Sequence, residues 1–274
     1  MDWTPTTGLE LVLNACEGVL QLVLTDDEEL LCAQEWDCSR HGTDILTPAI
    51  RQIFERTGRK IANLRRIGCM RGPGSFTGIR LVLATAAAMR RSTRARLAAL
   101  DYMQALATTV AMGERLLYDR KMWILTHARR DLVHACYMRC YGFAMPSYAI
   151  EPVTLVPLEA ARDLIRASCR DEARPVYVLG SGLARNDELF ETLIPLEKEG
   201  RLVLRPNIVS PSIPALRMLG RHGDYFDRDV EPLYVRPCDA VENLPVLAAK
   251  MGCDGEASVK KLREMLEAEP RSEI

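Results

Sequence analysis

The sequence has almost no excess of charge of either sign. Among its 274 residues, 36 Lys and Arg stand against 37 Asp and Glu, which gives a formal net charge of −1. A nearly neutral chain has no general electrostatic attraction to nucleic acid or to an anionic membrane. Any contact with nucleic acid must therefore be local, or must be made through a partner.

Long apolar runs and a leader segment are also missing. No uncharged stretch of about 18 residues is present, so no membrane-spanning helix is predicted. The N-terminus, MDWTPTTGLE, has no basic segment that leads into an apolar one, as a signal peptide would. We therefore expect a soluble, cytoplasmic protein that makes no membrane contact.

Cysteine is present, but not in pairs. The nine cysteines are scattered, their number is odd, and no Cys-x-x-Cys occurs. A chain of this length does not need disulfides for stability, so we expect reduced thiols. Cys136 and Cys140 are the only cysteines spaced closely enough to suggest zinc, but they lie on a predicted strand. The sequence predicts no metal site.

The remaining composition is that of a globular protein. Hydrophobic residues make up 48% of the chain and charged residues 27%, enough to fill and cover ordinary cores. A length of 274 residues suits two lobes of about 100 residues each.

A similar order of predicted elements occurs twice. Apolar alternation predicts three strands at the start of the first series, over 9–15, 19–25 and 30–36. Helices and strands then alternate: a helix over 40–56, a strand over 67–70, a helix over 79–89, a strand over 97–100 and a helix over 101–112. Asp101 and Gln104 match a capping box at the start of that last helix. The second series has strands over 121–127 and 132–140, a helix over 157–168, a strand over 176–180, a helix from about 186, a strand over 202–204, a helix over 211–222 and a final segment over 232–237.

This repetition predicts two related α/β lobes, at residues 1–100 and 101–237, of which the second is smaller. A tail over 238–274 follows, with one amphipathic piece around Val259, Leu262 and Leu266. We expect this tail either to dock on the body or a partner, or to be loosely ordered.

Residues 71–80, RGPGSFTGIR, have the chemistry of a phosphate-binding loop at the start of a helix. The candidate cofactor-binding residues are Gly72, Gly74, Ser75 and Thr77. The glycines miss the dinucleotide fingerprint G-x-G-x-x-G by one residue, and no GK[ST] follows, which excludes a P-loop. The alternative is a tight turn between a strand and a helix that Ser75 or Thr77 caps.

No catalytic constellation is evident. Ser75 is not in a G-x-S-x-G motif, and the four histidines, His41, His127, His134 and His222, stand in no recognisable pattern. We nominate no catalytic residue. The arginines of RRSTRAR, Arg90, Arg91, Arg94 and Arg96, could contact phosphate or RNA, but we interpret this stretch as a solvated connector.

Several segments resemble the TsaB (YeaZ) family of the glycoprotease-like (peptidase M22) superfamily, which acts in making threonylcarbamoyladenosine in bacterial tRNA. GPGSFTGIR with the alanine-rich helix after it is the most specific of them. RHGTDILTPAIRQIFERTG resembles the family's first helix, THARRDLVHACY its second-lobe hairpin, and EPLYVRP its near-terminal segment. The similarity covers most of residues 10–237 and is strongest in the first lobe.

The resemblance implies a two-lobed actin-like ATPase fold (ASKHA, ribonuclease H-like) with two related βββαβα-type lobes. In actin-like and sugar-kinase-like folds, the hairpin that starts each lobe carries an Asp that positions metal and nucleotide phosphates. Here Asn14 and His127 stand at those places. Neither side chain can replace a carboxylate around Mg²⁺. We therefore expect no independent phosphotransfer, and any nucleotide site should be weaker than in relatives.

The resemblance also implies partners. Members of this family pair with the catalytic, metal- and ATP-binding TsaD, and the ATPase TsaE joins them. The contact is a bundle of the two first-lobe helices, and the same face supports homodimers. Carried over to this chain, the interface comprises Asp44, Ile45, Pro48, Ala49 and Gln52 on the first helix, and Ile79, Val82, Leu83 and Ala86 on the second.

The sequence thus predicts a non-catalytic scaffold for a TsaD-like subunit in tRNA N6-threonylcarbamoyladenosine (t6A) modification, with tRNA contacted through the complex. It requires no cofactor of its own and leaves room for weak ATP or ADP binding at the partner interface. One alternative is a stand-alone ATPase or small-molecule kinase of the same fold. A glycoprotease-like peptidase is the other, but no metal-binding histidine pair supports it.

Overall fold

The computed structural model describes residues 8–38, 42–235 and 244–252, together with residues 254, 255, 257, 260 and 261. The chain divides into two units, Met1–Val235 and Arg236–Ile274. In the second unit, α9 (Leu244–Lys250) is the helix whose bounds are defined. The amphipathic positions Val259, Leu262 and Leu266 lie outside the described residues.

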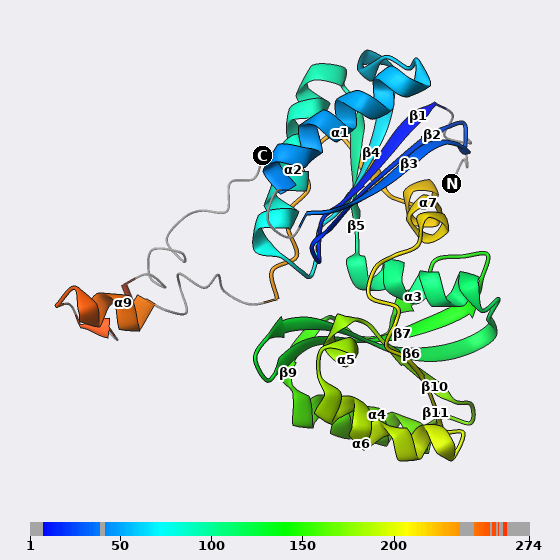
Figure 1. Cartoon of the computed structure of the whole chain (residues 1–274), viewed down its shortest axis with the longest axis vertical. Helices are drawn as coiled ribbons and strands as arrows, with labels where there is room; N and C mark the ends of the chain where they lie inside the picture. The colour runs from blue at the N-terminus through cyan, green and yellow to red at the C-terminus, as the bar shows by residue number, and fades with distance from the viewer. Residues whose placement is uncertain are drawn as a thin grey trace. The chain divides into compact units, whose positions relative to one another are not determined.

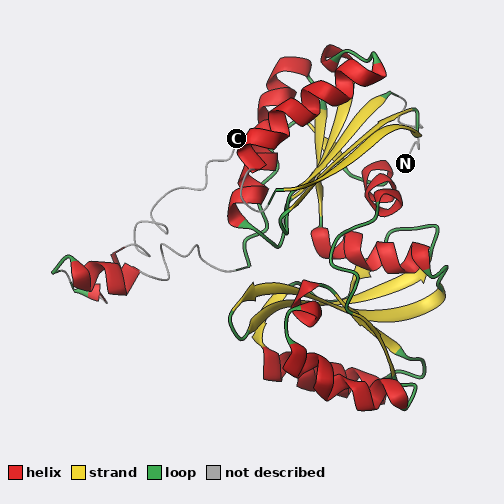
Figure 2. Cartoon of the chain, in the orientation of Figure 1, coloured by secondary structure: helices red, strands yellow, loops and turns green. Residues whose placement is uncertain are grey.

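The first unit contains two six-stranded sheets (Figures 1 and 2). The first sheet has the order β12-β5-β4-β1-β2-β3. Its strands are β1 (Leu9–Asn14), β2 (Val19–Asp26), β3 (Glu29–Asp37), β4 (Leu64–Met70), β5 (Arg96–Leu100) and β12 (Tyr225–Phe226). β1 pairs with β2 antiparallel and with β4 in parallel.

The second sheet repeats the arrangement of the first. Its order is β11-β10-β6-β7-β8, with β9 also paired to β7. The strands are β6 (Leu117–Arg129), β7 (Leu132–Gly142), β8 (Tyr148–Ala149), β9 (Thr154–Pro157), β10 (Val176–Leu179) and β11 (Leu202–Arg205). Again the first strand, β6, pairs antiparallel with its hairpin partner and in parallel with the strand after a crossover. The two sheets are thus built on one plan, as the repeated order of predicted elements indicated.

Helices cover both sheets. On the first sheet, α1 (Gly42–Thr57) and α2 (Phe76–Thr93) lie on one face, while α7 (Ile213–Arg221) lies on the other (Figure 1). On the second sheet, α4 (Leu158–Asp171) and α6 (Asp187–Lys198) form an outer layer, and α5 (Ser181–Ala184) packs on β6. We call the first sheet with α1, α2 and α7 the first lobe, and the second sheet with α4, α5 and α6 the second lobe.

α3 (Tyr102–Gly113) packs on β6 and β7 of the second lobe and on α7 of the first. Alternation along β6 explains how this sheet is buried on both faces. Met122 and Ile124 join the core that includes α3, whereas Trp123 and Leu125 join the core beneath α4 and α6. A strand buried on both sides needs apolar residues at successive positions, which MWIL, residues 122–125, provides.

The chain returns to the first lobe after crossing the second. α7 contacts β1 and β2, and β12 pairs with β5 at the edge of the first sheet. The prediction assigned these residues to the second lobe, 101–237, whereas β12 belongs to the first sheet. The described part of the final segment, residues 232–235, has no helix or strand.

One predicted detail is wrong. Asp101 does precede α3, but its side chain makes no capping hydrogen bond. Its Oδ1 instead accepts from Arg71 Nε at 2.7 Å, while Gln104 donates to the carbonyl oxygen of Ser147 at 2.8 Å. Both capping groups are therefore engaged by residues far away in the sequence.

Candidate functional site

The glycine loop lies directly against the turn of the β1–β2 hairpin. The backbone N–H of Ser75 donates to the carbonyl oxygen of Cys16 at 2.5 Å. A Cβ added to Gly74 would lie less than 3.0 Å from that oxygen, and one added to Gly78 equally close to the carbonyl oxygen of Ala15. Backbone atoms cannot yield as a flexible side chain does. Packing against the hairpin is therefore enough to require both glycines.

The candidate phosphate-binding residues have different surroundings. Gly72 is buried, Gly74 is half-buried, and Ser75 and Thr77 are exposed. Ser75 is the N-cap of α2, and its Oγ accepts from the N–H of Gly78 at 3.2 Å. The loop therefore has the geometry of a capped turn between a strand and a helix, the alternative that the sequence allowed.

Asn14 is a structural residue of the hairpin. It is buried, and its Oδ1 accepts from the N–H of Cys16 at 3.0 Å, an Asx turn. Its Nδ2 donates to Gln21 Oε1 at 2.7 Å. Both ends of the amide are thus engaged within the hairpin, and neither points to a ligand.

Glu17, at the turn between β1 and β2, connects the two lobes. Its Oε1 accepts a hydrogen bond from the hydroxyl of Ser181, the first residue of α5. The Ser181 hydroxyl oxygen in turn accepts from the backbone N–H of His127 at 2.8 Å. The carboxylate of the first hairpin thus reaches the second hairpin through one serine.

Tyr102 lies beside the other oxygen of the Glu17 carboxyl group. Its hydroxyl donates to the carbonyl oxygen of Val209 at 2.9 Å and lies 3.4 Å from Glu17 Oε2. Burial raises the pKa of the Glu17 carboxyl, while the hydrogen bond from Ser181 and the charge of Arg185 act in the opposite direction. We call Glu17, Tyr102, His127 and Ser181 the interlobe cluster.

The side chain of His127 is half-buried and lies near the end of β6. Burial, and then the positive charge of Arg185, lower the pKa of this imidazole. The ring is therefore neutral at neutral pH. Its backbone, and not its ring, makes the contact with Ser181.

These residues do not fit a magnesium nucleotide. The amide of Asn14 is occupied inside its own hairpin, and the ring of His127 supplies no negative charge for a cation. The Glu17 carboxylate sits among the donors that would otherwise be open to a phosphate, and it would repel one. Within the described ranges, no group of three His, Cys, Asp or Glu side chains is placed to hold a metal ion.

The seven cysteines within the described residues are free thiols. Cys136 and Cys140 are both buried, and each thiol donates to a carbonyl oxygen nearby, those of Glu151 and Gly142 respectively, at 3.5 Å. Burial raises the pKa of Cys136 to about 12. These side chains pack as small apolar groups and are not activated as nucleophiles.

The predicted partner surface needs a correction on α2. Ile79, Val82, Leu83 and Ala86 are all buried in the core of the first lobe, so they cannot present a surface to a partner. The face of α2 that solvent reaches includes Ala84 and Ala88, four residues apart. The periodicity located the helix correctly but does not say which apolar stripe faces the sheet.

On α1 the nominated residues divide between the two faces. Ala49 is buried, Ile45 and Gln52 are half-buried, and Asp44 and Pro48 are exposed. Asp44, Pro48 and Gln52 are spaced by four and therefore lie on one side of the helix. We define the α1–α2 surface as Asp44, Pro48 and Gln52 with Ala84 and Ala88. It joins three of the residues predicted on α1 to two exposed alanines of α2 that were not among the predicted interface residues.

Two of the RRSTRAR arginines bind a later part of the chain. Arg90 pairs with Asp227 at 2.8 Å and with Asp229 at 3.0 Å, and Arg91 pairs with Asp229 at 2.6 Å. The interpretation of this stretch as a simple solvated connector is therefore wrong for Arg90 and Arg91, because they fasten residues 227–229 to α2. Arg94 and Arg96 are exposed.

One family model is similar to part of the chain. Residues 36–145 match the family model described as TsaD: tRNA N6-adenosine threonylcarbamoyltransferase. No curated protein matches the chain. No helix among the residues that the structure describes is long and apolar enough to span a membrane.

Two solved structures from Pseudomonas aeruginosa have a similar fold. One is an uncharacterized protein with similarity to peptidase YEAZ, at 17% identity and a TM-score of 0.61, with 84% of this chain and 100% of that chain covered. The other is YeaZ, at 16% identity and a TM-score of 0.64, with 83% and 99% covered. The resemblance to TsaB (YeaZ) and the two-lobed actin-like fold that it implied are thereby confirmed at the level of the fold.

Proposed function

We propose that this chain takes part in t6A modification of tRNA as a non-catalytic, cytoplasmic partner of a TsaD-like subunit. The match of residues 36–145 to the threonylcarbamoyltransferase family supports the process, and the YeaZ-like fold supports the kind of subunit. The interlobe cluster is the observation that supports a non-catalytic role. In this cluster, Glu17 accepts from the hydrogen-bond donors that a phosphate would need.

The proposed contact is the α1–α2 surface. Ala84 and Ala88 expose a smooth strip on which a helix of a partner could approach closely, because alanine side chains keep the backbones only a short distance apart. A TsaE-like ATPase joins the pair, and tRNA is held by the assembly. In isolation, the same surface pairs two copies of this chain.

We propose that the chain requires no cofactor of its own. Weak binding of ATP or ADP is assigned to the interface with the partner, and not to the crevice between the lobes. A stand-alone ATPase or kinase would need a phosphate site at that crevice, and a peptidase would need a nucleophile or a metal group. Neither alternative has a supporting arrangement among the residues that the structure describes.

Co-expression with the same organism's TsaD-like protein tests the proposal. The two chains should elute together in size-exclusion chromatography, and the pure chain should not hydrolyse ATP. If the two chains elute separately at micromolar concentrations, the proposed partner role is wrong. ATP turnover that Glu17→Ala alters would revive the kinase alternative.

A further inference from the structure

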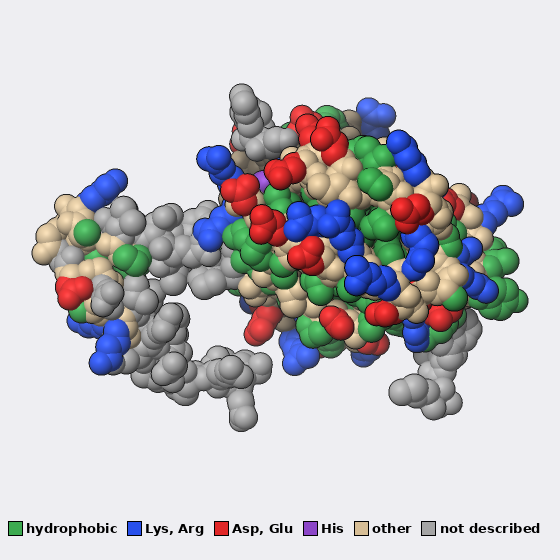
Figure 3. All heavy atoms as spheres, turned by 90° about the horizontal axis from the view of Figure 1, so that it is seen from below, with side chains coloured by type: hydrophobic (Ala, Val, Ile, Leu, Met, Phe, Trp, Pro, Cys, Tyr) green, Lys and Arg blue, Asp and Glu red, His purple; other side chains and the backbone are tan. Residues whose placement is uncertain are grey.

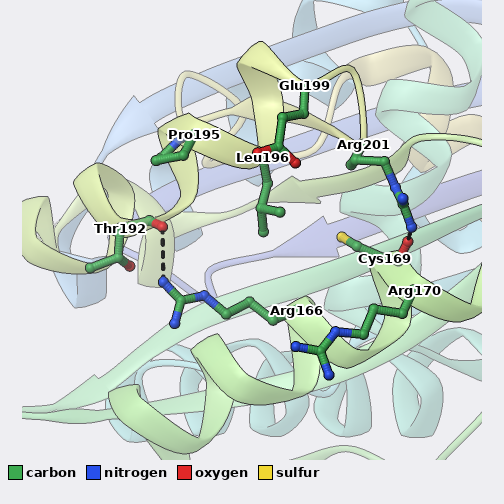
Figure 4. A pocket seen from close by; sticks show the side chains of 8 residues that line it. All are labelled: Arg166, Cys169, Arg170, Thr192, Pro195, Leu196, Glu199 and Arg201. Carbon is green, nitrogen blue, oxygen red and sulfur yellow. Dashed lines mark hydrogen bonds between the residues drawn. The ribbon is translucent and has the colours of Figure 1, made fainter.

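A groove between α4 and α6 on the outer face of the second lobe concentrates positive charge. Its volume is about 410 Å³, and it is lined by Arg166, Cys169, Arg170, Thr192, Pro195, Leu196, Glu199 and Arg201 (Figure 4). Three of these side chains are cationic and one is anionic, so the lining carries a net charge of +2 by count. In a chain whose net charge is −1, this is a local excess.

The spacing of the arginines continues beyond the groove. Arg162, Arg166 and Arg170 are four residues apart on α4, so they follow one another along the same side of the helix at intervals of about 6 Å. The neighbouring stripe, Ala161, Ile165 and Cys169, is buried against the sheet. Figure 3, which views the molecule from the side of these helices, shows several basic side chains near the middle of this face, with acidic side chains interspersed among them.

The groove arginines are not neutralised within the protein. Arg166 donates to the carbonyl oxygen of Thr192 at 3.4 Å, and Arg201 donates to the carbonyl oxygen of Cys169. Arg162 has Asp163 at 3.2 Å. Across the described parts of the chain, Arg166, Arg170 and Arg201 form no ion pair within 4.0 Å.

Ordinary helix capping explains only part of this arrangement. Arg201 and Arg170 lie near the C-terminal carbonyl groups of α4, where a cation is favourable. Arg166 is one turn earlier, and its charge repels that of Arg170 because like charges four residues apart destabilise a helix. An anion in the groove would reverse that effect.

We propose that this groove is a contact site for the phosphate backbone of RNA. Guanidinium groups bind phosphate oxygens in a bidentate manner, and a row of them suits a chain of phosphates better than one small anion. The choice of RNA as the occupant rests on the proposed function in tRNA modification. Such a contact positions the RNA without reading its sequence.

The test measures binding of a fluorescently labelled tRNA transcript to the full chain by anisotropy, over a series of salt concentrations. We compare the wild type with Arg166→Gln/Arg170→Gln. The control is Arg96→Gln/Arg130→Gln, which removes the same charge from two exposed positions elsewhere. Arg166→Lys/Arg170→Lys keeps the charge of the groove.

We expect the glutamine variant to bind about ten-fold more weakly or worse, as the loss of two charge-assisted hydrogen bonds implies. The slope of log K against log salt should fall by about 0.7–0.9 for each lost phosphate contact. The control should bind as the wild type, and the lysine variant should keep most of the salt dependence. Equal binding by wild type and glutamine variant, an equal loss in the control, or no binding of tRNA by the wild type would each overturn the proposal.

The outcome for the groove is separate from that for the proposed function. The same variants are passed over size-exclusion chromatography with the TsaD-like subunit. If the complex forms but the glutamine variant binds tRNA as the wild type does, the groove proposal is wrong and the partner role stands. If the variant loses tRNA binding and the wild type forms no complex, the partner role is wrong and the groove proposal stands.

Discussion

The Glu17 carboxylate accepts a hydrogen bond from the hydroxyl of Ser181, although the two residues lie 164 positions apart in the sequence. One is in the first hairpin of the first lobe, and the other begins α5 of the second. The same serine oxygen accepts from the backbone N–H of His127. An acidic side chain of the first hairpin is therefore linked through one serine to the backbone of the second hairpin.

Glu17→Gln should change how stability depends on pH. Because burial raises the pKa of Glu17 in the folded protein, the folded state holds this proton more strongly than the unfolded state. The wild-type free energy of unfolding should therefore fall as pH rises from the ordinary value of 4.5 through the raised pKa. The amide cannot titrate, so urea unfolding of the variant should lack this contribution.

Glu10 also has a pKa raised by burial, and it is present in both proteins, so the comparison isolates Glu17. The stability of Glu17→Gln relative to wild type should increase steadily across this pH window. A difference that stays constant with pH would show that the two states hold the Glu17 proton equally.

Gly74→Ala and Gly78→Ala should each destabilise the protein by about 1–3 kcal/mol, the usual cost of forcing atoms into a packed site. Each new methyl would meet a carbonyl oxygen of the β1–β2 turn. Gly113→Ala is the matched control, since nothing lies within 4 Å of its added Cβ. Thermal unfolding of the three variants checks this, and a Gly74→Ala protein as stable as the Gly113→Ala protein would contradict it.

Glu10→Ala should cost about 3–5 kcal/mol, because it leaves Arg66 charged, buried and without its partner. Glu10 Oε2 lies 2.9 Å from Arg66 Nη2, and their side chains are only 3% and 8% exposed. The double variant Glu10→Leu/Arg66→Met should recover most of that loss, since no unpaired charge remains. If urea unfolding finds the double variant less stable than Glu10→Ala, packing and not charge governs this pair.

The sequence predicted the architecture well because local patterns indicate the strands and helices of each lobe. Apolar strands such as LVLNA and KMWILTH, and the glycine loop before α2, need no knowledge of distant residues. The order of the elements then revealed the repeat. The return of α7 and β12 to the first lobe was missed, because the pairing of Tyr225 with Ala98 joins residues 127 positions apart in the sequence, which no local pattern reveals.

The site was harder to predict for the same reason. The sequence singled out Asn14, but the hydrogen bonds of its amide with Gln21 and with the backbone of Cys16 appear only in three dimensions. Glu17 and Ser181 were not nominated, because nothing in either segment indicates the other. On α2, two stripes of apolar residues compete for the sheet, and the larger side chains of Ile79, Val82 and Leu83 bury more surface there than the alanines would.

Binding to the TsaD-like subunit is the measurement that tests the central claim most directly. Ala84→Arg/Ala88→Arg places two long cations on the exposed strip of α2, and Ala167→Arg places one on the exposed side of α4. In size-exclusion chromatography of co-expressed chains, the wild type and Ala167→Arg should elute with the TsaD-like subunit, while the α2 variant should elute alone as a folded protein. A complex that tolerates Ala84→Arg/Ala88→Arg, or a wild type that forms none, would contradict the account.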